Sequence, residues 1–231
     1  MNDRKDEPEI SRTLWARGGK RLFDVIAAVL LLLVLSPVLL IAAGLVKLSS
    51  PGPAFFRQDR GGKDGRLFRP MKFRTMRGER MPDPLELVPL EHADVTAIGR
   101  FMRRFKIDEL PQLFNVVEGE MSLVGPRPTL PEQVAAYDEF RRQRLLARPG
   151  ITGLAQVYSS AAASWDERIM YDIAYVRRCS LPLDLAIFAR TMLTVALGEE
   201  HTSRPFAESA FAKIVPPPPD FGRFTARGTW E

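Results

Sequence analysis

The chain has 231 residues, and its 33 basic and 28 acidic side chains give a net charge of +5. This basic excess suits anionic lipid head groups, nucleotides or nucleic acid, and it does not choose among them. The single cysteine, Cys179, cannot form an internal disulfide, and with only two histidines a structural zinc site is not expected. A Mg²⁺ site stays open, because that ion needs only one or two carboxylates together with substrate phosphate.

Residues 25–46 form an uncharged apolar segment, about 30 Å long as a helix and therefore long enough to cross a bilayer. Basic residues flank it on both sides, which conflicts with the positive-inside rule for a simple crossing. Pro37 lies mid-segment and removes a backbone donor, and the Ser36 hydroxyl can satisfy the freed carbonyl. We therefore predict a re-entrant helix-break-helix over residues 17–48 that returns to the same face. An ordinary transmembrane helix with a proline kink remains the alternative.

The rest of the chain predicts an α+β, mostly helical protein. Residues 1–16 are polar and are expected to be disordered. Residues 49–197 are expected to form a small globular domain, and residues 198–231 a proline-rich extension or docking strand. Within the domain we expect a short β-hairpin at 53–75, with strands at Ala54–Arg57 and Leu67–Arg69 around a glycine-rich turn, and a loop at 80–94.

Hydrophobic periodicity predicts the helices of this domain. One helix is expected to begin at an Asp108 cap and to end at Gly119, with a buried stripe of residues spaced at i, i+3, i+4 and i+7. Further helices are predicted at Pro131–Leu146, Trp165–Arg178 and Leu181–Leu197. The last of these is rather apolar, so it is expected to rest on a bilayer.

Asp108 and Glu109 are adjacent carboxylates that follow a basic stretch. The structural interpretation is that Asp108 caps a helix and Glu109 complements its dipole. The functional interpretation is that an ionised carboxylate at this end is a nucleophile for a phosphoryl group that meets the same backbone donors. Either carboxylate is also a candidate ligand for Mg²⁺. Spacing alone leaves both interpretations open.

Cationic side chains near this pair are candidates for binding phosphate. Arg103 precedes it, and Arg127 lies between two prolines that restrict the backbone and preorganise the guanidinium fork. Lys72 alternates with apolar residues. Each also has a structural interpretation. Arg103 would belong to a solvated basic helix end, Arg127 to a structural loop, and Lys72 to the polar face of an edge strand. Asp172 and Asp184 lie in amphipathic helices, and the pattern alone makes them ordinary surface acids.

Taken together, the sequence motifs of this chain resemble those of the bacterial sugar transferases, the monotopic phosphoglycosyl transferases that act on polyprenyl phosphate. The similarity runs from about Lys20 to Leu197, and several long motifs occur in the right order. The matching stretches are 20–24, Ser36-Pro37, 50–53, 72–76, 108–116, 119–128 and 148–153.

The resemblance implies a small α+β domain on a re-entrant helix broken at Ser36-Pro37. It also implies that Asp108 attacks the β-phosphate of a nucleoside diphosphate sugar and expels a nucleoside monophosphate, usually UMP. The phosphosugar would stay on Asp108 until undecaprenyl phosphate attacks it. Glu109 would assist, with Mg²⁺ neutralising the phosphates.

The resemblance further implies roles for other side chains and partners. Arg103 and Arg127 match arginines that bind phosphate or nucleotide, Asp184 matches a site carboxylate, and Lys72 and Asp172 match positions of less certain role. A UDP-sugar, undecaprenyl phosphate and the cytoplasmic face of a bacterial inner membrane are the expected partners, in glycoconjugate or exopolysaccharide synthesis. A homodimer is left open, and no nucleic acid is expected.

One stretch departs from the family pattern. Residues 154–159 read Leu-Ala-Gln-Val-Tyr-Ser where the family commonly has Trp-Ala-Gln-Val-Asn-Gly, so the donor sugar is not defined by the sequence. Two other hypotheses follow. The chain would be a membrane-anchored binding protein without turnover, or a degenerate transferase that serves as a scaffold in polysaccharide assembly. The intact Asp108, Glu109 and Arg127 weigh against the second.

Overall fold

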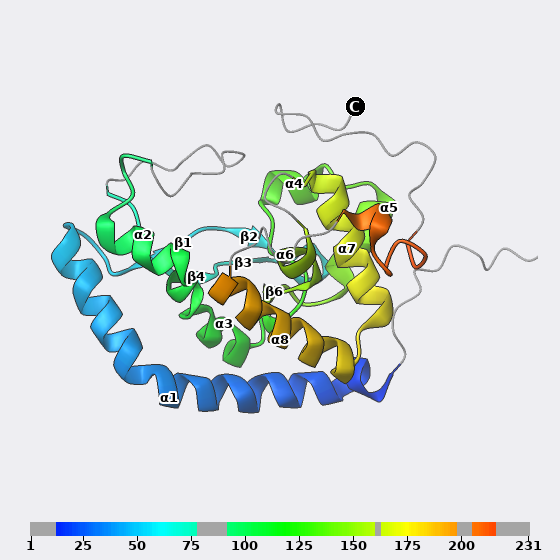
Figure 1. The fold of residues 1–231 in the computed structure, drawn as a ribbon, viewed down its shortest axis with the longest axis horizontal. Coiled ribbons are helices and arrows are strands. Elements are labelled where there is room, and N and C mark those ends of the chain that lie inside the picture. The colour runs from blue at the N-terminus through cyan, green and yellow to red at the C-terminus, as the bar shows by residue number, and fades with distance from the viewer. Residues whose placement is uncertain (1–12, 78–91, 160–162, 198–204, 216–231) are drawn as a thin grey trace, which may run out of the picture.

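The computed structural model describes residues 13–77, 92–159, 163–197 and 205–215, and within them the protein is α+β and mostly helical. Figure 1 shows the long helix α1 along one edge of the molecule, with the remaining elements gathered on one side of it. Most of the expected loop at 80–94, and the prolines at 216–219, lie outside the described residues.

α1 runs from Lys20 to Ser49, after a π-helical turn at Trp15–Gly19. Helical structure continues through Ser36 and Pro37, so the expected break is a bend within one helix, which Figure 1 shows part-way along α1. The proline lacks the N–H that would reach the Leu33 carbonyl four residues earlier. The Ser36 hydroxyl donates to that same carbonyl at 2.8 Å. Because the Ser36 hydroxyl replaces the missing N–H of Pro37 as donor, the helix bends without ending.

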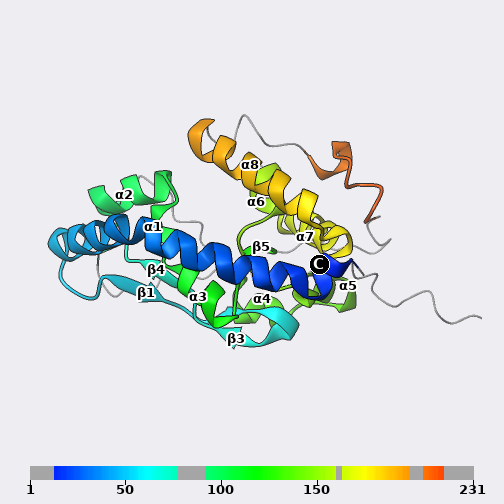
Figure 2. The same ribbon diagram turned by 90° about the horizontal axis from the view of Figure 1, so that it is seen from below.

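Both halves of α1 pack on the same globular domain. In the first half, Ala28 is fully buried in a cluster with Leu113 and Val116 of α3. In the second half, Val46 is buried in a separate cluster with Phe73 and Met102. Figure 2 shows α1 crossing the domain, with α2 and α8 on one side of it and β1 and β3 on the other.

The expected hairpin forms as two nested antiparallel ladders. β1 (Phe55–Arg57) pairs with β4 (Met71–Phe73), and β2 (Arg60–Gly61) pairs with β3 (Leu67–Phe68) around the 3₁₀ turn Lys63–Gly65. The prediction that Leu67–Arg69 pairs with Ala54–Arg57 is therefore wrong. The second arm of the hairpin consists of two strands, β3 and β4, rather than one. The strand that pairs with β1 is β4.

The segment around Asp108 differs from the predicted capped helix. α2 (Ala97–Arg104) is followed by the 3₁₀ turn Ile107–Glu109, and α3 spans Gln112–Glu118. Asp108 lies inside that turn and is not the cap of α3, whose first turn follows Pro111. The cause is a reversal of the chain between α2 and the turn, where Lys106 has a φ of 56°. The predicted end of α3 at Gly119 is confirmed, with a φ of 94°.

The second half of the domain contains a short parallel pair that the sequence did not predict, β5 (Ser122–Val124) beside β6 (Gly150–Thr152). The single helix expected at Pro131–Leu146 is divided, because Asp138 caps a new helix by accepting from the Arg141 N–H at 2.7 Å. The pieces are α4 (Pro131–Ala135), α5 (Glu139–Arg142) and the 3₁₀ turn Gln143–Leu146. α6 (Leu154–Tyr158) follows β6.

α7 (Trp165–Arg178) and α8 (Leu181–Leu197) have the predicted bounds, and α7 is the centre of the core. Residues 205–215 pack on α7 as turns, including the 3₁₀ turn Phe206–Glu208, rather than as a docking strand. The Phe206 N–H donates to Glu167 Oε1 at 2.7 Å, and the Phe206 ring contacts Tyr171 edge-on. This part of the predicted extension therefore belongs to the core.

Candidate active site

Glu109 lies where three separate segments meet. Its Oε1 accepts from Lys72 Nζ of β4 at 2.7 Å and from Arg127 Nη2, in the loop after β5, at 3.1 Å. The side chain is 8% exposed, so these cations replace most of its contact with water. The structure thus brings together three of the predicted site residues, and Glu109 holds the two cations in place.

The charges in this cluster influence one another strongly. Burial raises the pKa of Glu109, but the nearby Lys72 and Arg127 outweigh it and hold the pKa well below its usual range. Burial lowers the pKa of Lys72, and the contact with Glu109 opposes that effect. The lowered pKa favours the anionic form of Glu109, whose charge its partners Lys72 and Arg127 neutralise.

Asp108 differs from its neighbour, because its Oδ1 is buried and has no hydrogen-bond partner in the described part of the chain. Burial and the charge of Glu109 raise the pKa of Asp108, while Lys72, Lys106 and Arg103 act to lower it. A buried carboxylate oxygen without a donor is unfavourable in the free protein. It is therefore suited to bonding an electrophile or a cation that arrives with a substrate.

The backbone before Asp108 positions this carboxylate. Lys106 has the left-handed conformation that few side chains adopt, and it turns the chain from α2 into the 3₁₀ turn. The turn is closed by the Glu109 N–H, which donates to the Lys106 carbonyl at 3.3 Å. Such backbone conformations cost free energy and often occur at functional sites.

Arg103, on the last turn of α2, is near enough to Asp108 to lower the pKa of that carboxyl. Its Nε donates to Thr75 Oγ1 at 2.9 Å. Arg103 thus lies near Asp108, and its predicted role in binding phosphate or nucleotide stays a prediction.

Asp172 lies behind the site and is enclosed by protein. It is 1% exposed and accepts from Arg144 Nη2 at 2.5 Å. The same guanidinium donates to the Arg127 carbonyl at 2.8 Å, so Asp172 supports the loop that carries Arg127. The structure thus gives Asp172 a positioning contact, and no contact of its own with Asp108 or Glu109 among the described residues.

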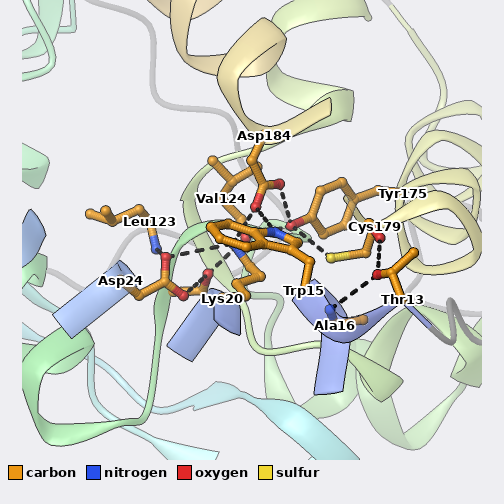
Figure 3. A network of polar contacts seen from close by, with 11 residues as sticks. Thr13, Trp15, Ala16, Lys20, Asp24, Leu123, Val124, Tyr175, Cys179 and Asp184 are labelled. Carbon is orange, nitrogen blue, oxygen red and sulfur yellow. Dashed lines mark hydrogen bonds and ion pairs between the residues drawn. The ribbon is translucent and has the colours of Figure 1, made fainter. Parts of the chain in front are cut away.

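Asp184 lies in a different cluster, shown in Figure 3, which joins the start of α1 to α7 and α8. Its carboxylate accepts from Trp15 Nε1 and Lys20 Nζ, each at 2.8 Å, and the Tyr175 hydroxyl donates to it, also at 2.8 Å. Trp15 belongs to the segment predicted to be disordered, and this contact explains why it is ordered. Asp184 is 1% exposed, and its partners Trp15 and Lys20 anchor the start of α1. The structure therefore does not bring Asp184 to Asp108.

Comparison with known proteins shows which family has this sequence. The family model described as "Bacterial sugar transferase" matches residues 15–198. The chain belongs to the bacterial sugar transferase family. The family's matched region covers every predicted site residue, including the segment with Lys72 and the loop with Arg127.

Curated members of the bacterial sugar transferase family show the same similarity. The sugar transferase EpsL of Bacillus subtilis is 41% identical, over 78% of this chain and 88% of its own length. The UDP-glucose:undecaprenyl-phosphate glucose-1-phosphate transferase of Caulobacter vibrioides is 44% identical, over 75% and 68%. An N-acetylgalactosaminephosphotransferase of Aeromonas hydrophila is 42% identical over 78% of this chain, but the match spans only 44% of that protein.

The site residues of this family member fit a Mg²⁺ ion that arrives with phosphate. No group of three or more His, Cys, Asp or Glu side chains that could hold a metal occurs among the described residues. Mg²⁺ does not need such a group, since one or two carboxylates and substrate phosphates suffice. Among the described residues Asp108 Oδ1 and Asp172 Oδ1 are both buried and unpartnered, but Asp172 is 1% exposed and paired with Arg144 through its other oxygen. Asp108 Oδ1 is therefore the oxygen that suits the ion, whereas Glu109 Oε1 is already used by Lys72 and Arg127.

Arg144 is a site-supporting residue that the sequence analysis missed. It is 1% exposed, and besides Asp172 it donates to the Tyr137 hydroxyl at 2.5 Å. In the sequence it is one arginine among several between Arg141 and Arg148, and no pattern sets it apart. Only the packing of the 3₁₀ turn Gln143–Leu146 against α7 identifies it.

Proposed function

We propose that the protein transfers a phosphosugar from a UDP-sugar to undecaprenyl phosphate through a covalent intermediate on Asp108, and that it releases UMP. The observation that supports this most is the buried, unpartnered oxygen of Asp108 beside a neutralised Glu109. The names of the Caulobacter and Aeromonas relatives supply the substrate classes, a UDP-sugar and undecaprenyl phosphate. The activity would be a membrane step in glycoconjugate or exopolysaccharide synthesis.

In the first half-reaction the Asp108 carboxylate attacks the β-phosphorus of the UDP-sugar. A bond forms between the carboxylate oxygen and phosphorus, and the bond from phosphorus to the bridging oxygen breaks. The electron pair of that bond leaves with the α-phosphate, as UMP. Asp108 is suited to this role because its oxygen has no competing donor, whereas Glu109 is held by Lys72 and Arg127.

In the second half-reaction a phosphate oxygen of undecaprenyl phosphate attacks the same phosphorus. The acyl phosphate bond to Asp108 breaks and the carboxylate is restored, so the product is a lipid diphosphosugar. The two substrates therefore react in turn at one phosphorus position, which is a ping-pong scheme.

The cations around Glu109 would stabilise the charge that develops on the phosphates. Lys72 and Arg127 are held by Glu109 before any substrate arrives, so little reorganisation is needed at the moment of reaction. Arg144 and Asp172 hold the backbone of Arg127 from behind. Asp108 is the residue that would hold a Mg²⁺ ion, and such an ion would supply positive charge for the substrate phosphates.

We also propose that α1 is re-entrant and that the site faces the cytoplasm at the inner membrane. α1 is the one helix in the described residues that is long and apolar enough to cross a membrane. Arg21 donates to the carbonyls of Val116 and Val117 near its start, and Val46 is buried against the same domain near its end. Apolar side chains on either side of the bend, such as Val34 and Leu40, are exposed. A straight crossing would separate the two docked ends by a bilayer.

The test uses purified protein in nanodiscs, Mg²⁺ and a panel of UDP-sugars, with and without undecaprenyl phosphate. For the correct donor we expect a burst of at most one UMP per protein without the lipid, and continued release once the lipid is added. UMP that appears only when both substrates are present would contradict the covalent scheme. No release with any donor under either condition would contradict the transferase activity itself.

A further inference from the structure

Arg60 is an arginine near the site to which neither the motifs nor the mechanism above assign a role. It lies on β2, and the next residue, Gly61, donates its N–H to the Thr129 carbonyl at 2.8 Å. A Cβ at Gly61 would come within 2.4 Å of Val134 Cγ2, so β2 is packed tightly against α4. This contact fixes Arg60 beside the loop that carries Arg127.

The charge of Arg60 is not balanced in the free protein. Its Nη2 donates to Gln58 Oε1 at 2.8 Å, and it forms no ion pair with any of the described residues. Burial and the charge of Arg127 lower the pKa of Arg60 to about 10, while Glu109 and Glu132 act in the opposite direction from beyond contact distance. Glu109 Oε1 is already shared by Lys72 and Arg127.

The guanidinium groups of Arg60 and Arg127 repel each other, and the Glu109 carboxylate that pairs with Arg127 is also shared with Lys72, so a further anion would be favourable here. A diphosphate is an anion of the right kind, because it offers two phosphate groups to two planar forks. Arg127 and Glu109 are among the charges that shift the pKa of Arg60, whereas Arg103, Lys106 and Lys72 are among those that shift the pKa of Asp108. The backbone contact of Gly61 with Thr129 thus places Arg60 beside the loop with Arg127, and Glu109 acts on its pKa.

We propose that Arg60 binds the phosphate that is bonded, through the bridging oxygen, to the phosphorus that Asp108 attacks. This inference rests on the proposed function. In the first half-reaction that phosphate belongs to the leaving UMP. In the second, the lipid phosphate approaches the same phosphorus from the side opposite Asp108, so it occupies the same position. Arg60 would therefore serve both substrates in turn.

The experiment compares wild type with Arg60→Gln, Arg60→Lys and the control Arg66→Gln, an exposed arginine of the same hairpin. Each half-reaction is measured separately, as adduct formation from the UDP-sugar and as the chase of preformed adduct by undecaprenyl phosphate. We expect Arg60→Gln to slow both about 10- to 100-fold, the size of hydrogen bonds lost to a charged group. Arg60→Lys keeps the charge without the guanidinium fork, so its rates should lie between those of wild type and Arg60→Gln. Arg66→Gln should have the rates of wild type.

Two measurements separate binding from a structural role. UMP should raise the Tm of wild type and of Arg66→Gln, and this rise should be lost in Arg60→Gln. Without ligand, Arg60→Gln should not lower the Tm, because the substitution removes a repulsion. A loss confined to one half-reaction would still assign Arg60 to phosphate, of the nucleotide or of the lipid respectively. Wild-type rates and UMP response in Arg60→Gln, or a lowered Tm with both unchanged, would overturn the proposal.

The outcomes also distinguish this inference from the proposed function. If wild type forms no adduct and releases no UMP, the transferase mechanism fails. The UMP-induced Tm shift, compared between wild type and Arg60→Gln, still reports whether Arg60 holds a phosphate.

Discussion

Two buried clusters of this protein contain carboxylates that the family resemblance assigns to the site, and their surroundings are opposite. The oxygens of Asp184 accept from an indole, an ammonium and a phenol, so its bonding capacity is used within the protein. Asp108 has a buried oxygen with no donor and a charged neighbour in Glu109. The first arrangement holds elements together, and the second leaves bonding capacity for a substrate.

The two clusters are linked through strand β5. Asp24 of α1 accepts from the Ser122 hydroxyl at 2.7 Å and from the Leu123 N–H at 3.2 Å, and the Tyr175 hydroxyl lies 3.0 Å from the Val124 carbonyl. β5 leads directly into the loop with Arg127. The Asp184 cluster therefore fixes where α1 and the loop with Arg127 lie relative to each other.

Asp108→Asn should produce the largest effect. We expect adduct formation and turnover to fall at least about 10³-fold, since the nucleophile is lost. The Tm should not fall, because burial and Glu109 already disfavour the charge that asparagine removes. Intact mass and a thermal melt on the same sample check both. A marked drop in Tm would show that Asp108 is a structural residue like Asp184.

Asp184→Asn should have the reverse outcome. Removing one partner of a buried ion pair costs about 3–5 kcal/mol, because Lys20 keeps only the more distant Asp24, at 3.5 Å. Thermal or denaturant unfolding measures this loss. The rate of adduct formation per folded molecule should stay near that of wild type. Loss of adduct formation at full stability would instead place Asp184 in contact with substrate.

Lys72→Met should alter the pH dependence of the first half-reaction. In the proposed mechanism Asp108 attacks as the anion, so the rate should fall as pH drops through its pKa, which Lys72 lowers. Without Lys72 that pKa rises further, and the acid limb of the profile should move to higher pH. The rate at neutral pH should fall about 10²- to 10³-fold. Lys63→Met, an exposed lysine of the same hairpin, is the control. An unshifted profile would contradict the coupling.

Trp15→Phe should have the smallest effect. It removes the indole N–H that donates to Asp184 but keeps an aromatic ring against Phe23. A hydrogen bond to a charged group contributes about 1.5–3 kcal/mol, which sets the expected loss of unfolding free energy. Adduct formation should be unchanged. A loss as large as that of Asp184→Asn would mean that the ring, rather than the bond, orders the start of α1.

Local patterns predicted much of the fold. The bounds of α7 and α8, the end of α3 at Gly119 and the apolar α1 follow from periodicity, a glycine and length. The division at Asp138 was missed because an internal cap competes with a continuous helical pattern. β5 and β6 were missed because three-residue strands that pair across the sequence leave little local signal.

The site was predictable only in part. Asp108, Glu109 and Arg127 stand in conspicuous motifs, and the structure brings them together with Lys72. Asp172 and Asp184 carry the same kind of side chain, and no sequence pattern reveals that one faces Arg144 and the other Lys20. Asp108 and Asp172 each keep a buried oxygen without a partner among the described residues, and tertiary packing decides which carboxylates do so.

The most direct test of the central claim is to locate the intermediate on the chain. Wild-type protein is incubated with Mg²⁺ and the UDP-sugar that gives the UMP burst, then quenched, digested and mapped by mass spectrometry. A covalent intermediate on Asp108 predicts a mass increase of one phosphosugar on the peptide that contains Asp108, with fragment ions that place it on that residue. A phosphosugar on any other residue, or a UMP burst with no modified peptide, would contradict it.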